Sequence, residues 1–471
     1  MIQLNLLNSI VSASLAIMTA GTPYLSSLYF PQLSTALNLS QKETSFIAAS
    51  ANNGVYLSGP VFGHLVDRLR TRTGMFLISG GLTIFIGYSI VSGIYSRLIP
   101  QPHFLVVSLV FLIVGCGSSA IYHCALTTNC RNWPLDKRGV AVGITVGVFG
   151  VAASVFAEAG SRMFSKADVL DVGDFLLFVG TSCLLINMLA SLTLRDISSD
   201  TPATESPSET TPLIVGEPRD SWDDDLSSDD NDFVGDAEWR QSLQTGIPLE
   251  DISCFVYLDC YLLVFFMFTI AGIGLMFINN VGAIIVSLAA PDQDASHPVI
   301  HQAQRLHVLV LSIVGFLSRV LVGVLADTLD RTVGFPRSLW PIIGSVTMAA
   351  ACCLILNAQT VSDILPASVL VATAYGVVWT ITPVLLGEYF GFNKFGSNWG
   401  WMTVVPAFGG QAFSLIFGHV YDLNAVSHIC KGVDCFYSSF TISLAVCLAC
   451  LTSNVLLAIR RWPKKDLPLY Q

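Results

Sequence analysis

One arginine inside an apolar run is the residue of this sequence best placed to do chemistry. Arg319 follows VLVLSIVGFLS and precedes VLVGVLAD, about eight residues, or ~12 Å of helix, from the polar end of the run. A guanidinium near the centre of a bilayer costs ~2.5 kcal/mol or more and usually marks a functional pathway. Arg319 could therefore hold the negative charge of a bound solute. A structural ion pair, or a side chain that snorkels to the membrane surface, is the alternative.

Polar and aromatic side chains in other apolar runs could complete a binding site around that charge. The candidates are Tyr122, His123, Asn279, Asn280, Tyr375 and Trp379. An amide in hydrocarbon needs a partner, either a solute or a neighbouring helix. A histidine can titrate near physiological pH, or it can simply be packed and hydrogen-bonded. The aromatic side chains could line a cavity or form part of a core.

A carboxylate near the end of a further apolar run offers a second charge. Glu158 could take up a proton during a transport cycle, or it could balance the charge of Arg319. A carboxylate that simply lies in interfacial water is an equally good interpretation. We therefore list Glu158 as a candidate for ion coupling.

The elements that must hold these residues are membrane-spanning helices. Of 471 residues, 53% are hydrophobic and only 12% are charged, whereas soluble domains carry about a quarter charged residues. The apolar residues come in runs of about 20, which suffice to cross ~30 Å of hydrocarbon as helix. We place twelve runs near 8–29, 44–65, 74–95, 103–126, 138–160, 174–194, 257–288, 306–326, 338–358, 364–387, 397–420 and 437–459. The sequence thus predicts an all-α polytopic membrane protein, and it argues against nucleic-acid binding and against a soluble enzyme.

The charges of the loops predict the topology of the chain, and one acidic segment divides it in two. Sixteen Lys and Arg lie in one set of alternate loops and six in the other, which predicts that both termini are cytosolic. The segment 195–252 holds 16 of the 33 acidic residues and is rich in Ser, Thr and Pro, so it cannot bury a core. We expect an N-terminal six-helix bundle (1–194), a disordered acidic cytosolic linker (195–252), a C-terminal six-helix bundle (253–459) and a basic cytosolic tail (460–471). Six spans on either side of a linker are typical of a duplicated transporter.

Two loops carry further motifs. In the linker, Glu209 stands four residues before Leu213 and Ile214, which resembles a dileucine sorting signal for cytosolic adaptors; a chance match is the alternative. Cys430 and Cys435 share a polar loop predicted on the lumenal side, where they could close a disulfide or stay as thiols. The sequence shows no phosphate-cradling loop, metal-ligand cluster or nucleophile triad, so we expect no cofactor and no metal.

A pattern that occurs twice leads to a family resemblance. SGPVFGHLVD (58–67) and SRVLVGVLAD (318–327) each carry a serine, a glycine five residues later and an aspartate four after that. With the arginines that follow Asp67, the first copy resembles the signature loop between spans 2 and 3 of the major facilitator superfamily. The resemblance implies two six-helix bundles around a central cavity. It also implies a gate, formed by Gly63, Asp67, Arg68, Arg70, Gly323 and Asp327.

Five longer blocks are similar to the nodulin-like branch of that superfamily and to fungal monocarboxylate-transporter homologues. They are GTPYLSSLYFPQLSTALNLSQ (21–41), ANNGVYLSGPVFGHLVDR (51–68), GCGSSAIYHCALTTNCRNWPLDKRG (115–139), AGIGLMFINNVG (271–282) and GEYFGFNKFGSNWG (387–400). Monocarboxylate transporters also carry an arginine four residues before a glycine of the span, as Arg319 precedes Gly323. Their aspartate one turn earlier is replaced here by Gly315.

The resemblance implies a secondary active transporter that moves a small organic solute by alternating access. The charge of Arg319 favours an anionic solute, with Arg319 as its anchor, and protons are candidate coupling ions. Its partners would be that solute, membrane lipid and a cytosolic sorting adaptor. A vacuolar membrane is the expected location, and the plasma membrane is the alternative. A membrane nutrient sensor that keeps the same fold, transports nothing and signals through the linker is the second hypothesis.

Overall fold

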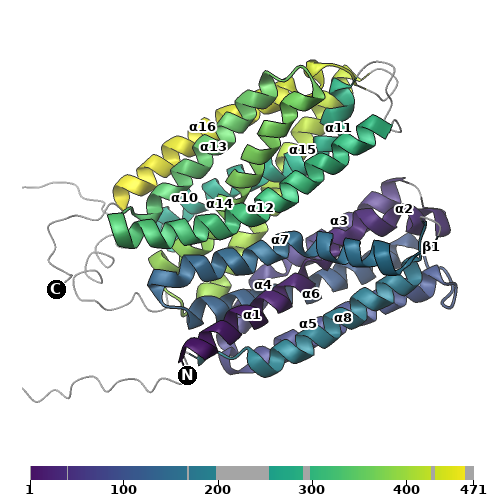
Figure 1. Cartoon of the computed structure of the whole chain (residues 1–471), viewed down its shortest axis with the longest axis horizontal. Coiled ribbons are helices and arrows are strands. Elements are labelled where there is room, and N and C mark those ends of the chain that lie inside the picture. The colour runs from purple at the N-terminus through teal and green to yellow at the C-terminus, as the bar shows by residue number, and fades with distance from the viewer. Residues whose placement is uncertain are drawn as a thin grey trace, which may run out of the picture.

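The computed structural model describes residues 2–39, 41–166, 169–197, 254–289, 298–425 and 430–461. These residues form two helical halves that lie side by side (Figure 1). The residues of the predicted sorting signal, Glu209, Leu213 and Ile214, lie outside the described residues, as do most of the predicted linker and tail.

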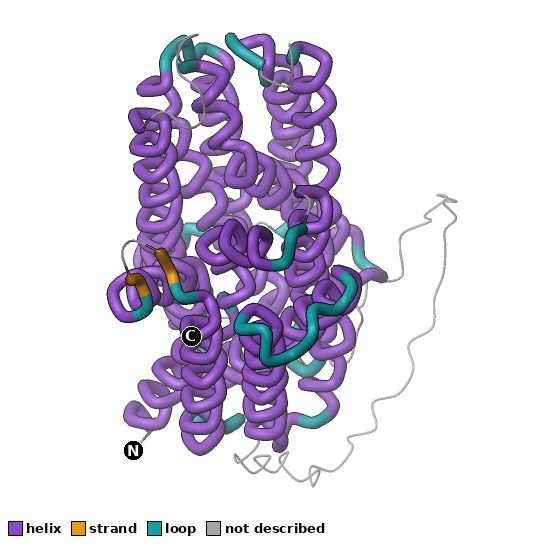
Figure 2. Tube along the Cα trace, turned by 90° about the vertical axis from the view of Figure 1, so that its right-hand side faces the viewer, coloured by secondary structure: helices purple, strands orange, loops and turns teal. Residues whose placement is uncertain are grey.

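The N-terminal half is built from helices and one small hairpin. Its elements are α1 (Ile2–Ala20), η1 (Thr22–Leu25), α2 (Ser26–Ala36), α3 (Gln41–Leu57), α4 (Gly59–Arg68), η2 (Arg70–Arg72), α5 (Thr73–Tyr95), α6 (Phe104–Asn132), η3 (Leu135–Lys137), α7 (Arg138–Met163), β1 (Ser165–Lys166), β2 (Val169–Leu170) and α8 (Val172–Thr193). The short antiparallel strands β1 and β2, drawn orange in Figure 2, join α7 to α8.

The C-terminal half contains helices and loops, with no strand among its described residues. Its elements are η5 (Cys254–Val256), α10 (Leu258–Phe266), the π-helical turn η6 (Met267–Ala271), α11 (Gly272–Leu288), α12 (Pro298–Val333), η7 (Arg337–Leu339), α13 (Trp340–Leu356), η8 (Val361–Asp363), α14 (Ile364–Phe390), α15 (Phe395–Asn424), η9 (Val433–Cys435) and α16 (Tyr437–Arg460).

Ten helical segments in the described part of the chain are long and apolar enough to cross a membrane. The first two predicted spans, near 8–29 and 44–65, are not among these ten, because each is divided into two shorter helices. Span 1 is divided at η1, which contains Pro23, and span 2 is divided at Ser58, just before Gly59 and Pro60 open α4. Proline lacks a backbone N–H and clashes with the preceding turn, so a helix tends to break or kink there.

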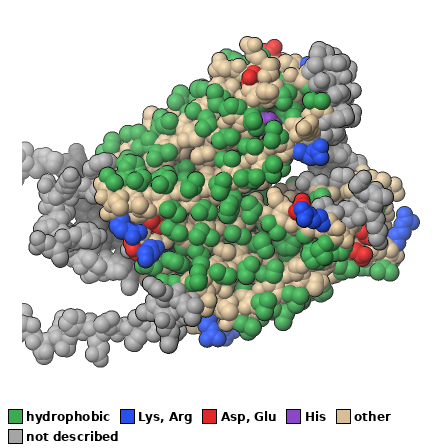
Figure 3. Space-filling model, in the orientation of Figure 1, with side chains coloured by type: hydrophobic (Ala, Val, Ile, Leu, Met, Phe, Trp, Pro, Cys, Tyr) green, Lys and Arg blue, Asp and Glu red, His purple; other side chains and the backbone are tan. Residues whose placement is uncertain are grey.

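The surface agrees with a membrane location. In Figure 3, hydrophobic side chains cover the broad middle of the visible face, whereas the Lys, Arg, Asp and Glu side chains gather towards its two ends. Exposed Leu, Ile and Val side chains on α5, α8 and α12 contribute to the apolar surface of the protein. Such a belt matches the hydrocarbon of a bilayer rather than water.

The two halves touch mainly through two pairs of helices, α7 with α12 and α4 with α15, and α7 and α6 also touch α14 and α15. Glycines make this approach so close that a Cβ on Gly63 would lie 2.0 Å from the carbonyl oxygen of Gly396. A Cβ on Gly323 would lie 2.2 Å from that of Gly139. The halves are close at the end that carries these glycines, where α1 begins and α16 ends, and they spread apart towards the other (Figure 1). We call these the closed end and the open end.

Candidate functional site

Arg319 lies where the two halves meet. It belongs to α12 of the C-terminal half, and only 7% of its surface is exposed. Its Nη1 donates a hydrogen bond of 3.0 Å to the carbonyl oxygen of Gly315, one turn earlier on the same helix. Across the interface, a Cβ on Gly150 of α7 would lie 2.4 Å from Nη1. The guanidinium therefore rests directly against the backbone of the opposite half.

The charge of Arg319 is surrounded by tyrosines rather than by carboxylates. Its Cζ is 5.6 Å from the centre of the Tyr375 ring. The hydroxyls of Tyr56 and Tyr122 are also close enough to interact electrostatically with the guanidinium. Among the described residues, Arg319 forms no ion pair, and its buried Nε has no hydrogen-bond partner. A buried cation with an unused donor is the arrangement expected of an anion-binding group.

Aromatic side chains of both halves surround this position. In the C-terminal half, the Trp379 ring is 6.0 Å from that of Tyr375 and 6.2 Å from that of Trp399. In the N-terminal half, the Tyr24 hydroxyl donates to the Tyr56 hydroxyl over 2.9 Å. The indole Nε1 atoms of Trp379 and Trp399 and the hydroxyl of Tyr122 are buried without a partner among the described residues. These polar groups lie among the aromatic side chains around the guanidinium.

Sequence reasoning missed three of these aromatic residues. Tyr24, Tyr56 and Trp399 were not among our candidates, although all three fall in the blocks that carry the family resemblance. An aromatic residue in an apolar run gives no signal of the face on which it lies. The breaks next to Tyr24 and Tyr56, at Pro23 and at Ser58, could have marked both positions.

His123 joins the two halves instead of lying beside Arg319. Its Nδ1 is 2.9 Å from the carbonyl oxygen of Ser119, and its Nε2 is 3.3 Å from the hydroxyl of Thr403 on α15. The ring is fully buried. Tyr122, its neighbour, turns towards Phe149, whose ring centre is 5.2 Å away. The packed and hydrogen-bonded interpretation therefore describes His123 well.

Among the described residues, Asn279, Asn280 and Glu158 form no hydrogen bond or ion pair with Arg319. The Asn280 amide donates to the carbonyl oxygen of Met276 on its own helix over 2.8 Å, and Asn279 is exposed on α11. Glu158 is exposed and pairs with Arg162, one turn later on α7, over 2.6 Å. The interfacial alternative thus fits Glu158 better than a counter-charge for Arg319.

The two repeated aspartates bind to the opposite half. The Asp67 carboxylate accepts the backbone N–H groups of Gly396 (2.9 Å) and Ser397 (2.6 Å), at the start of α15. Arg131, from the end of α6, pairs with Asp67 over 2.5 Å. Arg131 also donates to the Phe392 carbonyl oxygen of the other half over 3.2 Å. We call this group the first junction.

The second junction repeats the arrangement with the halves exchanged. The Asp327 carboxylate accepts the N–H groups of Gly139 (3.1 Å) and Val140 (2.8 Å), at the start of α7. Arg337 of η7 donates to Asp327 over 3.0 Å, and its guanidinium is 3.6 Å from Glu388.

The arginines expected near Asp67 behave differently from one another. Arg70 donates to the backbone oxygen (2.7 Å) and the side-chain oxygen (3.0 Å) of Asn393 in the other half. Arg68 is exposed and forms no hydrogen bond or ion pair with the described residues. The arginine that pairs with Asp67 is Arg131, which lies 64 residues further along the chain and which the signature loop does not contain.

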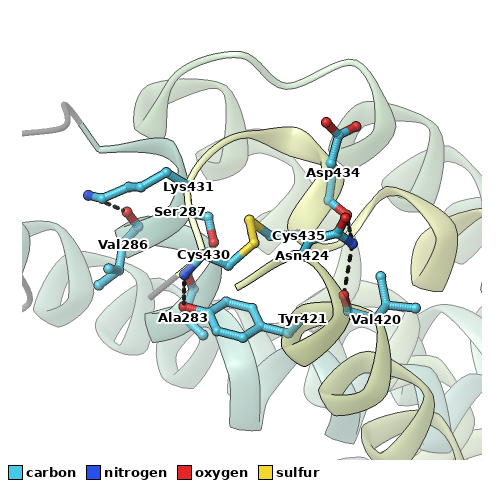
Figure 4. Close-up of a disulfide and its surroundings, with 10 residues drawn as sticks. All are labelled: Ala283, Val286, Ser287, Val420, Tyr421, Asn424, Cys430, Lys431, Asp434 and Cys435. Carbon is cyan, nitrogen blue, oxygen red and sulfur yellow. Dashed lines mark hydrogen bonds between the residues drawn. A yellow bond between two sulfur atoms is a disulfide. The ribbon is translucent and has the colours of Figure 1, made fainter. Parts of the chain in front are cut away.

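The open end carries a disulfide between Cys430 and Cys435 (Figure 4), whose Cα atoms are 5.8 Å apart. Beside it, the N–H of Cys430 donates to the Tyr421 hydroxyl over 3.3 Å, and Lys431 donates to the Val286 carbonyl oxygen at the end of α11 over 3.0 Å. This loop is therefore attached to α11 and α15. Among the described residues, no group of three or more His, Cys, Asp or Glu could hold a metal ion.

Comparisons with known proteins agree with this architecture. The profile of the Major Facilitator Superfamily matches residues 10–414. The protein named probable transporter MCH1 of Gibberella zeae is 24% identical, over 88% of this chain and 81% of its own length. Its namesake in Neurospora crassa is 23% identical, over 94% and 87%. The structure of the proton:xylose symporter XylE superposes with a TM-score of 0.68 at 14% identity, covering 98% of this chain and 97% of that one.

Proposed function

Because the chain belongs to the major facilitator superfamily, we propose that it is a secondary active transporter of a small, anionic organic solute. Its family and its relatives are membrane transporters rather than enzymes, and its helices form the twelve-span fold of that family. In this proposal the solute binds between the halves at Arg319, and the protein exposes that site to one side of the membrane at a time.

The observation that carries the proposal is the environment of Arg319. The guanidinium is buried at the meeting of the halves, and within the described part of the chain its Nε has no hydrogen-bond partner and the nearby ionisable side chains are tyrosines. A charge at this depth is unfavourable unless protein groups, water or an anion compensate it. A carboxylate solute would bind to the unused donors and also neutralise the charge.

The junctions supply the gate of this proposal. Asp67, Gly63 and Arg70 on one side, with Gly323 and Asp327 on the other, hold the closed end together, and Arg68 takes no part. We propose that the closed end faces the cytosol, because the loops on that side carry the excess of Lys and Arg. A vacuolar address through Glu209, Leu213 and Ile214 and coupling to protons stay predictions of the sequence.

Uptake of radiolabelled organic acids into proteoliposomes tests the anchor role. Lysine keeps the charge but loses the planar fork that binds a carboxylate with two hydrogen bonds. We therefore expect Arg319→Lys to reduce uptake about tenfold, the equivalent of one charge-assisted hydrogen bond. Arg319→Gln should nearly abolish uptake while the protein still folds. Uptake with and without an imposed pH gradient decides whether protons are coupled.

Arg305→Gln is the matched control, because Arg305 is an exposed arginine of the same helix. This variant should transport as the wild type does. A well-folded Arg319→Gln protein with wild-type uptake would exclude the anchor role. A protein that binds organic acids but moves none would favour the sensor hypothesis.

A further inference from the structure

Two glycines fix the position of the Arg319 guanidinium. Its Nη1 donates to the carbonyl oxygen of Gly315 on its own helix. On the opposite half, a Cβ added to Gly150 would lie 2.4 Å from Nη1 and 3.2 Å from Cζ. Any residue other than glycine at position 150 would therefore displace the guanidinium from this place. The Gly315 carbonyl draws Nη1 to one side, and the bare backbone at Gly150 leaves the space for it.

This arrangement leaves one edge of the guanidinium free. Nη1 is occupied, the buried Nε has no partner, and Nη2 forms no hydrogen bond with the described residues. Nε and Nη2 together form the edge with which an arginine can hold both oxygens of a carboxylate. The edge has a defined orientation only while the guanidinium rests against Gly150.

We propose that Gly150 is a positioning residue for the anion, which rests on the proposed function of Arg319. Gly150 belongs to α7 of the N-terminal half, whereas Arg319 belongs to α12 of the C-terminal half. The free edge is thus presented while the two helices are in contact, and it loses its support when they separate. The affinity for the anion should therefore differ between the two states of the protein, so that the anion shifts the equilibrium between them.

Three glycines, two on α7 and one on α15, provide a matched set of variants. At Gly143, a Cβ would meet the backbone carbonyl oxygen of Arg319 at 2.4 Å, and backbone cannot move without separating the helices. At Gly150, the Cβ would meet the far end of a flexible side chain. At Gly418 of α15, no atom of the described residues lies within 4 Å of an added Cβ. Alanine at position 143 should therefore disturb the helix packing, and alanine at position 150 should displace the guanidinium. Alanine at position 418 should do neither.

The experiment is calorimetric titration of the full-length protein in lipid nanodiscs with sodium benzoate, together with thermal unfolding. We expect Gly150→Ala to weaken benzoate binding about tenfold, since one charge-assisted hydrogen bond is lost, with the melting temperature unchanged. Gly143→Ala should lower the melting temperature, and Gly418→Ala should change neither quantity. In an Arg319→Lys background, Gly150→Ala should cause no further loss of affinity, because the two positions act through one group.

Wild-type benzoate affinity in Gly150→Ala would overturn the inference and leave the anchor role of Arg319 standing. An equal loss in the Arg319→Lys background would also overturn it, because position 150 would then act without the guanidinium. A wild-type protein that binds neither benzoate nor any acid of a carboxylate panel would remove the proposed function, and this inference with it.

Discussion

The two junctions at the closed end resemble each other in their aspartates and differ in their arginines. In each, an aspartate in the last two turns of one helix accepts two successive backbone N–H groups at the start of a helix in the other half. Those N–H groups belong to the second and third residues of α7 and α15, the donors that a helix N-cap normally satisfies. Neither helix has a side-chain cap of its own, since Lys137 and Lys394 occupy the cap positions. The opposite half therefore caps each helix.

The arginines that pair with the two aspartates differ in whether they also reach the other half. Arg131 pairs with Asp67 and also donates to the Phe392 carbonyl oxygen across the interface. Arg337 pairs with Asp327 and lies near Asp330 and Glu388, which all belong to its own half. The comparison indicates that Arg131 itself links the halves, whereas Arg337 mainly organises the C-terminal half around Asp327. Beside the second junction the link is made instead by Arg331, which donates to the Asp136 carbonyl oxygen over 3.2 Å.

The largest effect is expected from the aspartates. Asp67→Ala removes a helix cap, worth about 1 kcal/mol, and also breaks the buried pair with Arg131, which costs about 3–5 kcal/mol more. We expect much faster amide hydrogen exchange at the starts of both α15 and α7, because the whole closed end opens. Asp327→Ala should accelerate exchange mainly at the start of α7. Exchange measured by mass spectrometry on both segments checks this, and equal patterns in the two variants would refute the asymmetry.

Replacing the two arginines should distinguish the opening of the closed end from the thermal stability of the protein. Arg131→Gln should raise exchange at the start of α15 less than Asp67→Ala does, because Asp67 keeps both backbone N–H groups. Arg337→Gln should instead lower the melting temperature, since it leaves Asp327 buried without its arginine, a loss of about 3–5 kcal/mol. If Arg337→Gln opened the closed end as readily as Arg131→Gln, both arginines would be links between the halves.

The smallest effect distinguishes two neighbouring arginines of the signature loop. Arg70→Ala removes the hydrogen bonds to Asn393 and should modestly raise exchange in the 391–394 segment. Because Arg70 is only partly buried, water replaces much of what is lost, and each bond contributes about 0.5–1.5 kcal/mol. Arg68→Ala is the matched control and should change nothing, because Arg68 is exposed and unbonded among the described residues. An equal effect of both variants would show that the loop acts only through its net charge.

The sequence by itself determined the class and the architecture of this protein. Runs of about 20 apolar residues leave the backbone no choice but helices that satisfy their own hydrogen bonds in lipid. The repeat at Gly63, Asp67, Gly323 and Asp327 marked the residues that meet the other half, because close helix contact and an acidic helix cap both need particular residue types. Arg319 was detectable for the same reason, since charge within an apolar run is costly anywhere in a membrane.

The tertiary structure decided which residues become neighbours across the interface. Arg131 and Arg337 could be seen in the sequence only as loop charges, because their partners are set by how the two halves pack. The same holds for Tyr24, Tyr56 and Trp399 around Arg319, and for Gly150, one of several glycines on α7. Glu158 was a candidate from the sequence, but the structure shows it exposed on α7 and paired with Arg162. Spacing along a helix fixes a residue's depth in the membrane, but the face that meets the other half depends on packing between segments far apart in the chain.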